Sequence, residues 1–555
     1  MNQLSETDPL SVASLFIHSL EQESVDTVFG SMFHSLFFNE RKKINYIQLT
    51  HEQSVIHAAD GYARATGKPG VAFITTEYGL TNAITGIATA QIDSIPLVVF
   101  IQKDSNKNRQ LDVESITKSI SKYHYTIRKS ADIHTITAQA IKNSLLNRPG
   151  VIIIEFDESV LLRKSEQPVV YKLLSSLERN HTKLSLKHLE KIIAAIKCAK
   201  KPVLIIGGGV IAGNASNELL YFIKKTKIPF TSTLMGLGAV NVKHPLHLGM
   251  LGMHGTFAAN RAVHRADLLI CLGVRFSDRI TGKTRGFSPK SLKIHVEIDP
   301  SEVNKNIPVD YPVIGDVKDF LLKINPEFDQ YRPHHWYNEV IKWRKISPQF
   351  NQSKSKLGPE RIIKLLHTHA EKNVIIATDV GQHQMWTALH FPFDKPRKLL
   401  TSGGFGTMGF GLPAAIGGAI SHPGQSVICV TGDGSIQMQI QELFHVAKYN
   451  LNIKIVILRN GYLGMVRQWQ QLFYNNKYSQ VKITSPDFVS FANSLGVRAF
   501  QASSESDADI FIKKAFQYDG PVLLDFLIEE EGNVFPIVPP GGNNTDALQE
   551  DPSNT

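Results

Sequence analysis

Residues 431–462 combine a carboxylate, an amide and a glycine-rich turn in one short stretch. Their sequence, TGDGSIQMQIQELFHVAKYNLNIKIVILRNGY, predicts a strand, a sharp turn, a helix and a second strand that ends at Asn460. Because parallel strands end at the same edge of a sheet, Asp433 and Asn460 should lie close together. Their oxygen atoms suit Mg²⁺, and the glycines and the helix N-terminus suit a phosphate group. The stretch therefore predicts a Mg²⁺-diphosphate site, and the alternative is an ordinary turn between a strand and a helix.

The composition is that of a large globular enzyme. The chain has 555 residues, of which 42% are hydrophobic and 20% charged, and a formal net charge of +10. Its lysines and arginines are scattered, whereas a nucleic-acid binder usually has a basic stripe, and no apolar run reaches the roughly 18 residues that span a bilayer. Three distant cysteines form no metal or disulfide pattern, and the polar N-terminus is unlike a signal peptide. We therefore expect a cytoplasmic protein that binds neither nucleic acid nor a membrane.

Alternating strand and helix patterns predict an α/β protein with three doubly wound domains, each built on a parallel sheet. The first domain is expected to cover residues 1–175, the second 186–330 and the third 358–535. A polar connection with one helix is expected between the last two domains. The Gly-, Pro- and Asn-rich residues 536–555 predict a disordered tail.

A strand followed by a glycine turn, PVLIIGGGVIAG, opens the second domain. Gly207, Gly209 and Ala212 fit a loose dinucleotide fingerprint, which is a weak signal by itself. The acidic residue that would bind the ribose is expected about 20 residues further on. Asp299 lies far beyond that point, so the sequence does not favour simple NAD binding.

Several long segments together resemble the catalytic subunits of the acetohydroxyacid synthases (acetolactate synthases), a family of thiamine-diphosphate (ThDP) enzymes. The similarity extends along nearly the whole chain. At 431–462 the family signature begins with Gly-Asp-Gly and ends in two asparagines, although Arg459 stands here in place of the first. The matching segments are HEQSVIHAADGYARATGKPGV, LGMLGMHGT, GVRFSDRITGK, DVGQHQMW, SGGFGTMGFGLPAAIG, TGDGSIQMQIQEL and NGYLGMVRQWQ.

The resemblance implies three domains that bind, in order, the pyrimidine ring of ThDP, FAD without net redox chemistry, and the diphosphate with Mg²⁺. ThDP would lie between the first domain of one subunit and the third domain of another, so a homodimer would be the smallest active form. The family also implies that a homotetramer can form and that a small regulatory subunit can bind. The implied reaction decarboxylates pyruvate and joins the product to pyruvate or 2-oxobutanoate. Its products, 2-acetolactate and 2-aceto-2-hydroxybutanoate, belong to the synthesis of valine and isoleucine.

Glu52 resembles the glutamate that bonds the aminopyrimidine ring of ThDP. A carboxyl group there favours the imino tautomer, whose nitrogen can take the proton from the thiazolium carbon C2. The alternative for Glu52 is that it caps the helix that follows it. Arg279 resembles an arginine near the acceptor carboxylate, with a surface or FAD-facing ion pair as the alternative. Trp469 resembles the tryptophan linked to choice of the larger acceptor.

The resemblance also implies the residues that contact each cofactor. In the third domain, Asp433, Asn460 and the backbone carbonyl of Tyr462 would hold Mg²⁺. The implied ThDP contacts there are Val380, Gly381, Gln382, His383, Gly406, Met408, Gly432, Asp433, Gly434, Ser435, Asn460, Leu463, Gly464, Met465 and Val466. The implied FAD contacts are Gly207, Gly208, Gly209, Thr233, Leu234, Met235, Leu251, Gly252, Met253, His254, Gly273, Arg275, Glu297, Ile298, Asp316 and Val317.

The departures from the family gather in first-domain loops at the mouth of the site. Because Glu52, Asp433 and Asn460 are retained, we expect an active enzyme. Two alternatives stay open, a related ThDP decarboxylase or carboligase with a different acceptor and a non-catalytic paralogue. The altered positions are Ser31-Met32-Phe33-His34, Thr76-Glu77-Tyr78-Gly79, Asn108-Arg109 and Glu158, where the family has Pro-Gly-Gly, Ser-Gly-Pro-Gly, Phe-Gln and lysine.

Overall fold

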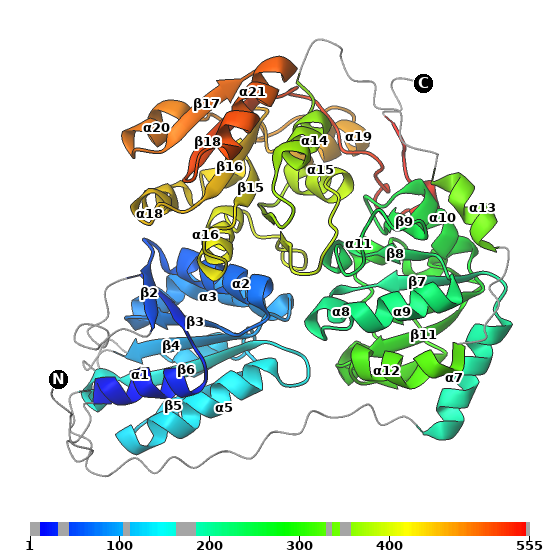
Figure 1. The fold of residues 1–555 in the computed structure, drawn as a ribbon, viewed down its shortest axis with the longest axis horizontal. Coiled ribbons are helices and arrows are strands. Elements are labelled where there is room, and N and C mark those ends of the chain that lie inside the picture. Colours follow the sequence, from blue (N-terminus) through cyan, green and yellow to red (C-terminus); the bar gives the residue numbers. More distant parts are fainter. Residues whose placement is uncertain are drawn as a thin grey trace.

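The computed structural model describes residues 12–31, 44–103, 111–161, 185–328, 336–344 and 357–550. Three six-stranded sheets lie one in each of the three expected domain ranges, with helices packed on their faces (Figure 1). The strand pairings within these sheets are parallel. The predicted fold class is therefore confirmed. Within the described ranges, no helix is long and apolar enough to cross a membrane.

The first domain has the strand order β2-β1-β3-β4-β6-β5. Its central strands are continuous Val, Ile and Phe runs that are buried on both faces, as parallel sheets require. Its strands are β1 (Thr27–Gly30), β2 (Asn45–Gln48), β3 (Gly70–Ile74), β4 (Leu97–Lys103), β5 (Tyr123–Ile127) and β6 (Val151–Asp157). Its helices are α1 (Val12–Gln22), α2 (Glu52–Thr66), α3 (Glu77–Ile92), α4 (Val113–Thr117), α5 (Ile133–Leu145) and α6 (Glu158–Leu161).

The middle domain has the strand order β12-β11-β10-β7-β8-β9. Numbered within the domain this is 3-2-1-4-5-6 read from the other edge, the order of dinucleotide-binding sheets. Its strands are β7 (Pro202–Ile206), β8 (Phe230–Ser232), β9 (His247–Met250), β10 (Leu268–Leu272), β11 (Leu292–Glu297) and β12 (Tyr311–Ile314). Its helices are α7 (Leu186–Cys198), α8 (Gly208–Ala212), α9 (Ser216–Thr226), α10 (Phe257–Arg265), α11 (Asp278–Thr281), α12 (Val317–Ile324) and α13 (Trp336–Trp343).

The third domain has the order β14-β13-β15-β16-β18-β17, which repeats the strand order of the first domain. Its strands are β13 (Ile375–Thr378), β14 (Leu399–Leu400), β15 (Val427–Gly432), β16 (Ile453–Arg459), β17 (Arg498–Ala502) and β18 (Val522–Leu527). Its helices are α14 (Pro359–His369), α15 (Gln382–His390), α16 (Gly411–Ser421), α17 (Asp433–Ile436), α18 (Leu443–Lys448), α19 (Gly464–Phe473), α20 (Phe488–Ser494) and α21 (Glu505–Phe516).

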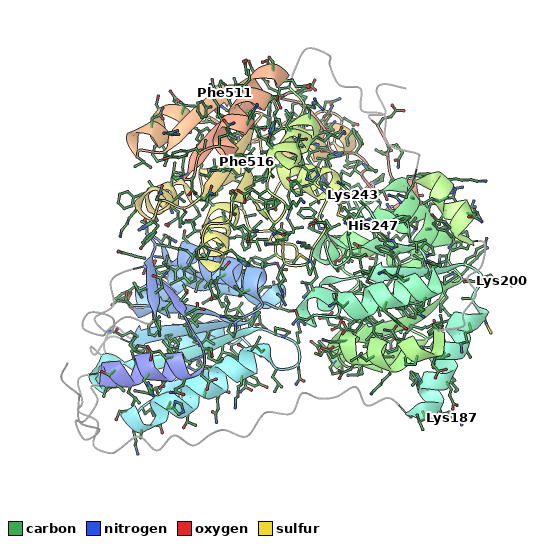
Figure 2. All side chains as sticks on the ribbon, in the orientation of Figure 1. Lys187, Lys200, Lys243, His247, Phe511 and Phe516 are labelled. Carbon is green, nitrogen blue, oxygen red and sulfur yellow. The ribbon has the colours of Figure 1, made fainter. Side chains whose placement is uncertain are left out.

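Side chains fill the interior of all three domains (Figure 2). Phe511 and Phe516 of α21 pack against the core of the third domain, while Lys187 and Lys200 lie at the outer edge of the middle domain. One apolar cluster is shared by the first and third domains and includes residues of both sheets and of α2 and α16. The middle domain has its own apolar cluster between its sheet and helices. The first and third domains of one chain are therefore bound by a common core.

Helices α2 and α16 make that junction at the level of their backbones. A Cβ placed on Gly61 would lie 2.3 Å from the carbonyl oxygen of Ala414. A Cβ placed on Gly417 would lie 1.9 Å from the carbonyl oxygen of Ala58. Only glycine fits at these two positions, because the neighbouring atoms are backbone and cannot move independently.

The C-terminal residues differ from the expectation of a disordered tail, which is wrong as far as residue 550. Ile537 and Val538 are buried, and Ile537 pairs with Leu548. The amide of Val538 donates to the carbonyl of Met253 at 2.9 Å, which fastens the segment to the middle domain. The glycines, prolines and asparagines of this segment form turns between the residues that contact the middle domain. Their abundance therefore indicates tight turns and not disorder. Residues 551–555 lie outside the described part of the chain.

We expect Gly417→Ala to destabilise the protein, because the new methyl group must displace the α2 backbone. Overpacking of this kind costs about 1–3 kcal/mol or more. Gly532→Ala is the matched control, since a Cβ there would lie 3.7 Å from its nearest neighbour. Calorimetry should show a lower unfolding temperature for Gly417→Ala alone. Equal unfolding temperatures for the two variants would contradict the backbone contact.

Candidate active site

A cavity of about 940 Å³ lies where the three domains meet. The middle domain forms one side, the third domain the other, and the first-domain segment after α3 contributes to the wall. The cavity brings the expected FAD-contacting residues together with expected ThDP-contacting loops. Of the predicted residues, those that line it are Gly208, Gly209, Thr233, Leu234, Met235, Leu251, Met253, His254, Gly273, Arg275, Arg279, Glu297, Ile298, Asp316, Val317, Val380, Gly381, Gly406, Met408, Met465, Val466 and Trp469.

The remaining predicted residues lie beside the cavity or apart from it. Gly207 and Gly252 of the middle domain do not line it. Glu52 is in the first domain and does not line the cavity of its own chain. The third-domain residues outside the lining are Gln382, His383, Gly432, Asp433, Gly434, Ser435, Asn460, Tyr462, Leu463 and Gly464.

The middle-domain part of the cavity opens at the switch point of the sheet, between β7 and β10. Open α/β sheets bind ligands at this point. Gly207 and Gly273 follow these two strands, and a Cβ on Gly207 would lie 2.0 Å from the carbonyl oxygen of Gly273. Gly273 also has φ of +60°, a conformation that favours glycine. The two glycines therefore let the loops close tightly at the floor of the cavity.

Glu297 ends β11 at the rim of this part. Its Oε1 accepts hydrogen bonds from the amides of Ile298 and Asp299 at 2.9 and 3.2 Å. Burial raises the pKa of Glu297 to about 7, although these amides act in the opposite direction. A carboxyl group held in this way can bond the hydroxyl groups of a ribose. The glycine floor, the Glu297 carboxyl group and the cavity volume fit a dinucleotide such as FAD.

The predicted metal-binding residues meet at the carboxyl ends of β15 and β16. Asp433 follows β15 and Asn460 follows β16, and these strands pair in register. The carboxylate of Asp433 accepts from the Gly461 amide at 3.0 Å and from the Ser485 hydroxyl at 3.1 Å. The Asn460 side-chain oxygen accepts from the Tyr462 amide at 3.1 Å and keeps a second lone pair. Burial raises the pKa of Asp433, and a bound cation would stabilise its ionised form.

Arg459, which replaces the first asparagine of the family signature, does not enter this group. Its guanidinium donates to Asp525 on β18 at 3.1 Å. The Asn460 side-chain amide instead donates to Gln382 at 3.3 Å. The replacement leaves the oxygen ligands in place.

The surroundings of the metal group suit a polar ligand. The Nε2 atom of His383 is buried and has no hydrogen-bond partner among the described residues, and burial lowers the pKa of this histidine to about 3. His383 is therefore a neutral imidazole that can bond a ligand. It lies beside Gly432, because a Cβ placed on Gly432 would be 2.9 Å from the Nδ1 atom of His383. At Gly464 a Cβ would lie 2.1 Å from Gln382, so only glycine lets Gln382 and Asn460 remain in contact. These residues fit a diphosphate with its metal ion.

The helix expected after the glycine turn is broken, which corrects that part of the prediction. Helix α17 ends at Ile436, and α18 begins at Leu443. Polar groups between these two helices bond to the first domain. The Glu442 carboxylate, for example, accepts from the amide of Thr50 at 3.2 Å. Contacts with the first domain therefore override the local helical pattern.

Glu52 is the first residue of α2, but it is not the cap of that helix. The cap is His51, whose ring accepts from the amide of Gln53. The Glu52 carboxylate is held from two sides, by the Ser31 hydroxyl at 2.9 Å and by the Asn82 side-chain amide at 3.0 Å. These donors fix the carboxyl group at the carboxyl edge of the first sheet and leave it accessible.

Arg279 and Trp469 line the same cavity from two domains. Arg279 lies on α11 of the middle domain, is exposed, and points its Nη1 toward the Met253 sulfur at 3.6 Å. In the described part of the chain no carboxylate lies within ion-pair distance of Arg279, so the alternative of an ion pair is not seen there. Trp469 lies on α19 and packs edge-to-face on Phe473. A guanidinium group and a bulky aromatic side chain thus face one space.

Two structural residues, Asp379 and Asn82, were missed by the sequence reasoning, and Ser31 was noted only as a departure from the family. Asp379 follows β13 and accepts from the amides of Val380, Gly409 and Gly411, although burial raises its pKa to about 6. It thereby joins two loops of the cavity. Ser31 and Asn82 orient Glu52. The position of Asp379 at a strand end was the available signal, whereas nothing local marks Asn82.

The departures from the family are only partly described. Ser31 holds Glu52, Thr76 caps α3, and Tyr78 is 47% exposed. Glu77 and Glu158 begin helices, and their side chains are outside the described structure. Met32, Phe33, His34, Asn108 and Arg109 lie outside the described residues.

Comparison with known families matches all three domains to thiamine pyrophosphate enzymes. Residues 10–125 match the N-terminal TPP binding domain, 189–324 the central domain, and 379–526 the C-terminal TPP binding domain. The two TPP binding domains are those that carry Glu52 and Asp433.

Relatives match the chain over nearly its whole length. It is 36% identical to the acetolactate synthase large subunit of Haemophilus influenzae, over 98% of this chain and 99% of the relative. It is 38% identical to the large subunit of Buchnera aphidicola from Acyrthosiphon pisum, over 96% and 97%. It is 36% identical to the isozyme 2 large subunit of Escherichia coli, over 97% and 99%. The chain therefore belongs to the thiamine pyrophosphate enzymes and, among these, to the acetolactate synthase large-subunit family.

Proposed function

We propose that this enzyme decarboxylates pyruvate and joins the remaining two-carbon unit to the carbonyl carbon of a second 2-oxo acid. With pyruvate as acceptor the product is 2-acetolactate, and with 2-oxobutanoate it is 2-aceto-2-hydroxybutanoate. One CO₂ is released and one proton is taken up, so no electrons pass to or from FAD. The observation that carries the proposal is the single cavity that Arg279, Trp469 and the Met408 loop line together.

ThDP, when bound, supplies an acidic thiazolium carbon and an electron sink for the decarboxylation. Asp433 and Asn460, with the carbonyl of Tyr462, would hold the Mg²⁺ that neutralises the diphosphate. The backbone of Gly432 and Gly434 can approach the phosphate oxygens closely, and His383 provides a buried polar atom that has no partner among the described residues.

Glu52 would hold a proton at a ring nitrogen of the aminopyrimidine. The hydroxyl of Ser31 and the amide of Asn82 already fix the orientation of its carboxyl group, so little reorganisation is needed. As the family resemblance implies, we propose that Glu52 serves the third domain of a second subunit. Like Asp433 and Asn460, it does not line the cavity of its own chain.

Arg279 would bind the carboxylate of the acceptor through paired hydrogen bonds. Trp469 would limit the space left for the acceptor's side chain. The middle domain would hold FAD, with Glu297 at a ribose and the glycine floor beneath the dinucleotide. These roles account for the residues that line the cavity on each side.

A homodimer is the assembly that we propose, alone or within a homotetramer. Large apolar side chains near the predicted ThDP-binding segments of the first and third domains are about half exposed: Tyr78 at 47%, Phe405 at 52% and Val466 at 50%. Exposed apolar groups of this size are typical of surfaces that another chain covers. We further propose a small regulatory subunit as a partner and the cytoplasm as the location.

The first test is the identity of the product. Purified protein incubated with pyruvate, ThDP, Mg²⁺ and FAD should form 2-acetolactate, measured by mass spectrometry, together with one CO₂ per product. Added 2-oxobutanoate should give the six-carbon product as well. Acetaldehyde as the main product would contradict the proposed carboligation, and the absence of CO₂ would contradict catalysis.

Glu52→Gln tests the activating acid. It keeps the size of the side chain but cannot exchange the proton, so kcat should fall by about 10²–10⁴-fold. Binding of ThDP, followed by quenching of tryptophan fluorescence, should persist. Glu505→Gln, an exposed acid of α21, is the control. Full activity of Glu52→Gln would show that another group performs this step.

Asp433→Asn tests the metal site. Loss of the charged ligand should raise the Mg²⁺ concentration for half-maximal activity about tenfold or more, equivalent to about 1.4 kcal/mol. Arg459→Asn is the neighbouring control, because its side chain points to Asp525. It should change the Mg²⁺ requirement less than roughly threefold, by the same conversion. Similar shifts in both variants would argue against Asp433 as a direct ligand.

A further inference from the structure

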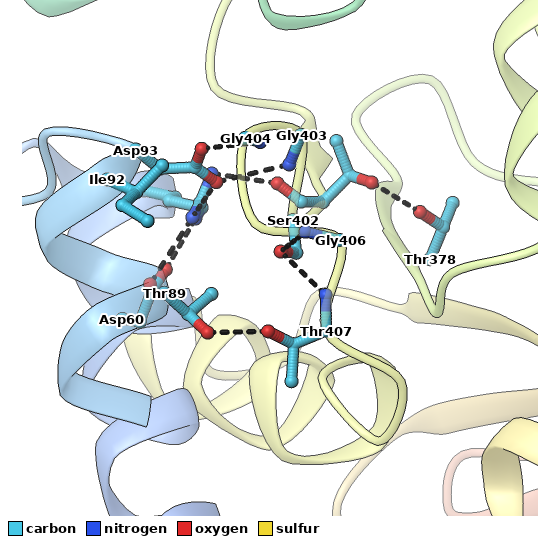
Figure 3. Close-up of polar contacts among 12 residues, drawn as sticks. Asp60, Thr89, Ile92, Asp93, Thr378, Ser402, Gly403, Gly404, Gly406 and Thr407 are labelled. Carbon is cyan, nitrogen blue, oxygen red and sulfur yellow. Dashed lines mark hydrogen bonds and ion pairs between the residues drawn. The ribbon is translucent and has the colours of Figure 1, made fainter. Parts of the chain in front are cut away.

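A buried carboxylate of the first domain holds a loop of the third domain. Asp93 follows α3, and its side chain is fully buried. Its Oδ2 accepts from the amide of Gly403 at 3.1 Å, and its Oδ1 accepts from the amide of Gly404 at 2.7 Å (Figure 3). Both glycines line the cavity. Asp93 and Gly403 are 310 positions apart in the chain, so no local sequence pattern predicts their contact.

The same loop, residues 401–409, has further tethers to the first domain. The hydroxyls of Thr89 and Thr407 are 2.6 Å apart, and Arg64 donates to the carbonyl of Thr401 at 2.8 Å. Inside the loop, the Ser402 hydroxyl accepts from the amide of Gly406 at 3.1 Å (Figure 3). The loop is thus fastened near both ends by the first domain and closed upon itself between them.

The loop needs such support because of its sequence, SGGFGTM. Glycine loses more conformational freedom on ordering than any other residue, and Gly406 has φ of +73°. On the side of the middle domain, a Cβ on Gly403 would lie 2.4 Å from the sulfur of Met235. The loop is therefore confined between Asp93 and Met235, and it carries Gly406 and Met408 into the cavity.

The charges around Arg64 show that Asp93 is not needed only to neutralise Arg64 and can also bind the loop amides. Arg64 is almost fully buried and contacts two carboxylates, Asp60 and Asp93. One carboxylate would suffice to neutralise the guanidinium. Burial acts to lower the pKa of Arg64, but the two carboxylates outweigh it, and the arginine stays charged. Asp60 bonds only to Arg64 among the described residues, whereas Asp93 also bonds to two loop amides.

The same turn also meets the middle domain. Arg275 donates to the carbonyl of Ile92. Arg148 donates to the Ser94 hydroxyl at 2.9 Å and to Asp299 at 3.0 Å. Segment 92–94 is therefore a point at which all three domains are joined, and Asp93 is its link to the glycine loop.

We propose that Asp93 is a positioning residue that presets loop 401–409 for ThDP, acting through the amides of Gly403 and Gly404. It touches no reacting atom. The consequence for ThDP rests on the proposed function, whereas the restraint on the loop does not.

Hydrogen exchange tests the restraint without any cofactor. Asp93→Asn, compared with the full-length wild type, should accelerate exchange of the peptide that covers residues 401–409 by at least tenfold, because an amide cannot accept from both glycines and Arg64. Asp60→Asn is the matched control, since it also removes one buried charge beside Arg64 and should change this peptide less than threefold. Equal exchange in both variants would overturn the proposal.

The second readout is the dependence of activity on ThDP. Asp93→Asn should raise the ThDP concentration for half-maximal activity at least tenfold, with kcat at saturation within threefold of wild type. Asp60→Asn should change neither by more than threefold. A fall in kcat with an unchanged ThDP requirement would overturn the positioning role. A wild type that binds no ThDP, with exchange as expected, would instead contradict the proposed function alone.

Should Asp93→Asn fail to fold, Thr89→Val carries the test, because it removes the Thr89–Thr407 tether without removing a charge. It should accelerate exchange at residues 401–409 at least threefold, with unchanged exchange in α19. No acceleration would show that the first domain does not restrain the loop.

Discussion

Helices α2 and α16 touch backbone to backbone, and the arrangement of the site depends on this contact. Gly61 and Gly417 make the close approach possible, and one continuous apolar core joins the two domains around it. The contact fixes how the first domain is held against the third in a single chain. Glu52, at the start of α2, then stands outside the cavity that its own third domain lines. In the proposed function, Glu52 therefore serves the third domain of a second chain.

Three parallel sheets place the chemistry at their carboxyl edges. The first sheet presents Glu52, the third presents Asp433 and Asn460, and the cavity opens at the switch point of the middle sheet. The cavity lies beside the switch point of the middle sheet and the loops of the third domain, and Glu52, Asp433 and Asn460 do not line it. Its wall is irregular backbone rich in glycine, which lets ligands approach closely but leaves the loops with little order of their own. Buried acids such as Asp379 and Asp93 supply that order by accepting backbone amides.

Much of the fold could be predicted from the sequence, because central parallel strands are long apolar runs. The patterns VAFITT, PVLIIG and SVICVTG all correspond to such strands. Short edge strands such as β5 and β14 were not predicted, because they are partly exposed or only a few residues long. The helix after Asp433 and the tail from residue 536 were predicted wrongly. In both cases contacts with a distant domain decide the local structure.

The residues of the candidate site were predicted from the sequence, but most of the contacts between them were not. Motif spacing was enough to bring Asp433 and Asn460 together, since adjacent strands end at one edge. It could not find Asn82 beside Glu52, or Asp93 beside Gly403, because these partners meet only in the folded chain. The capping role considered for Glu52 falls to His51, which local sequence alone does not reveal.

The central claim is that each site takes Glu52 from one subunit and Asp433 from another. It is tested most directly with a purified heterodimer of a Glu52→Gln subunit and an Asp433→Asn subunit, isolated through two different affinity tags. If the site is shared, one of its two sites is fully intact, and the heterodimer should have about half of the wild-type activity. If each site lies within one subunit, both sites carry a defect. Activity no higher than that of the two parent variants would then contradict the account.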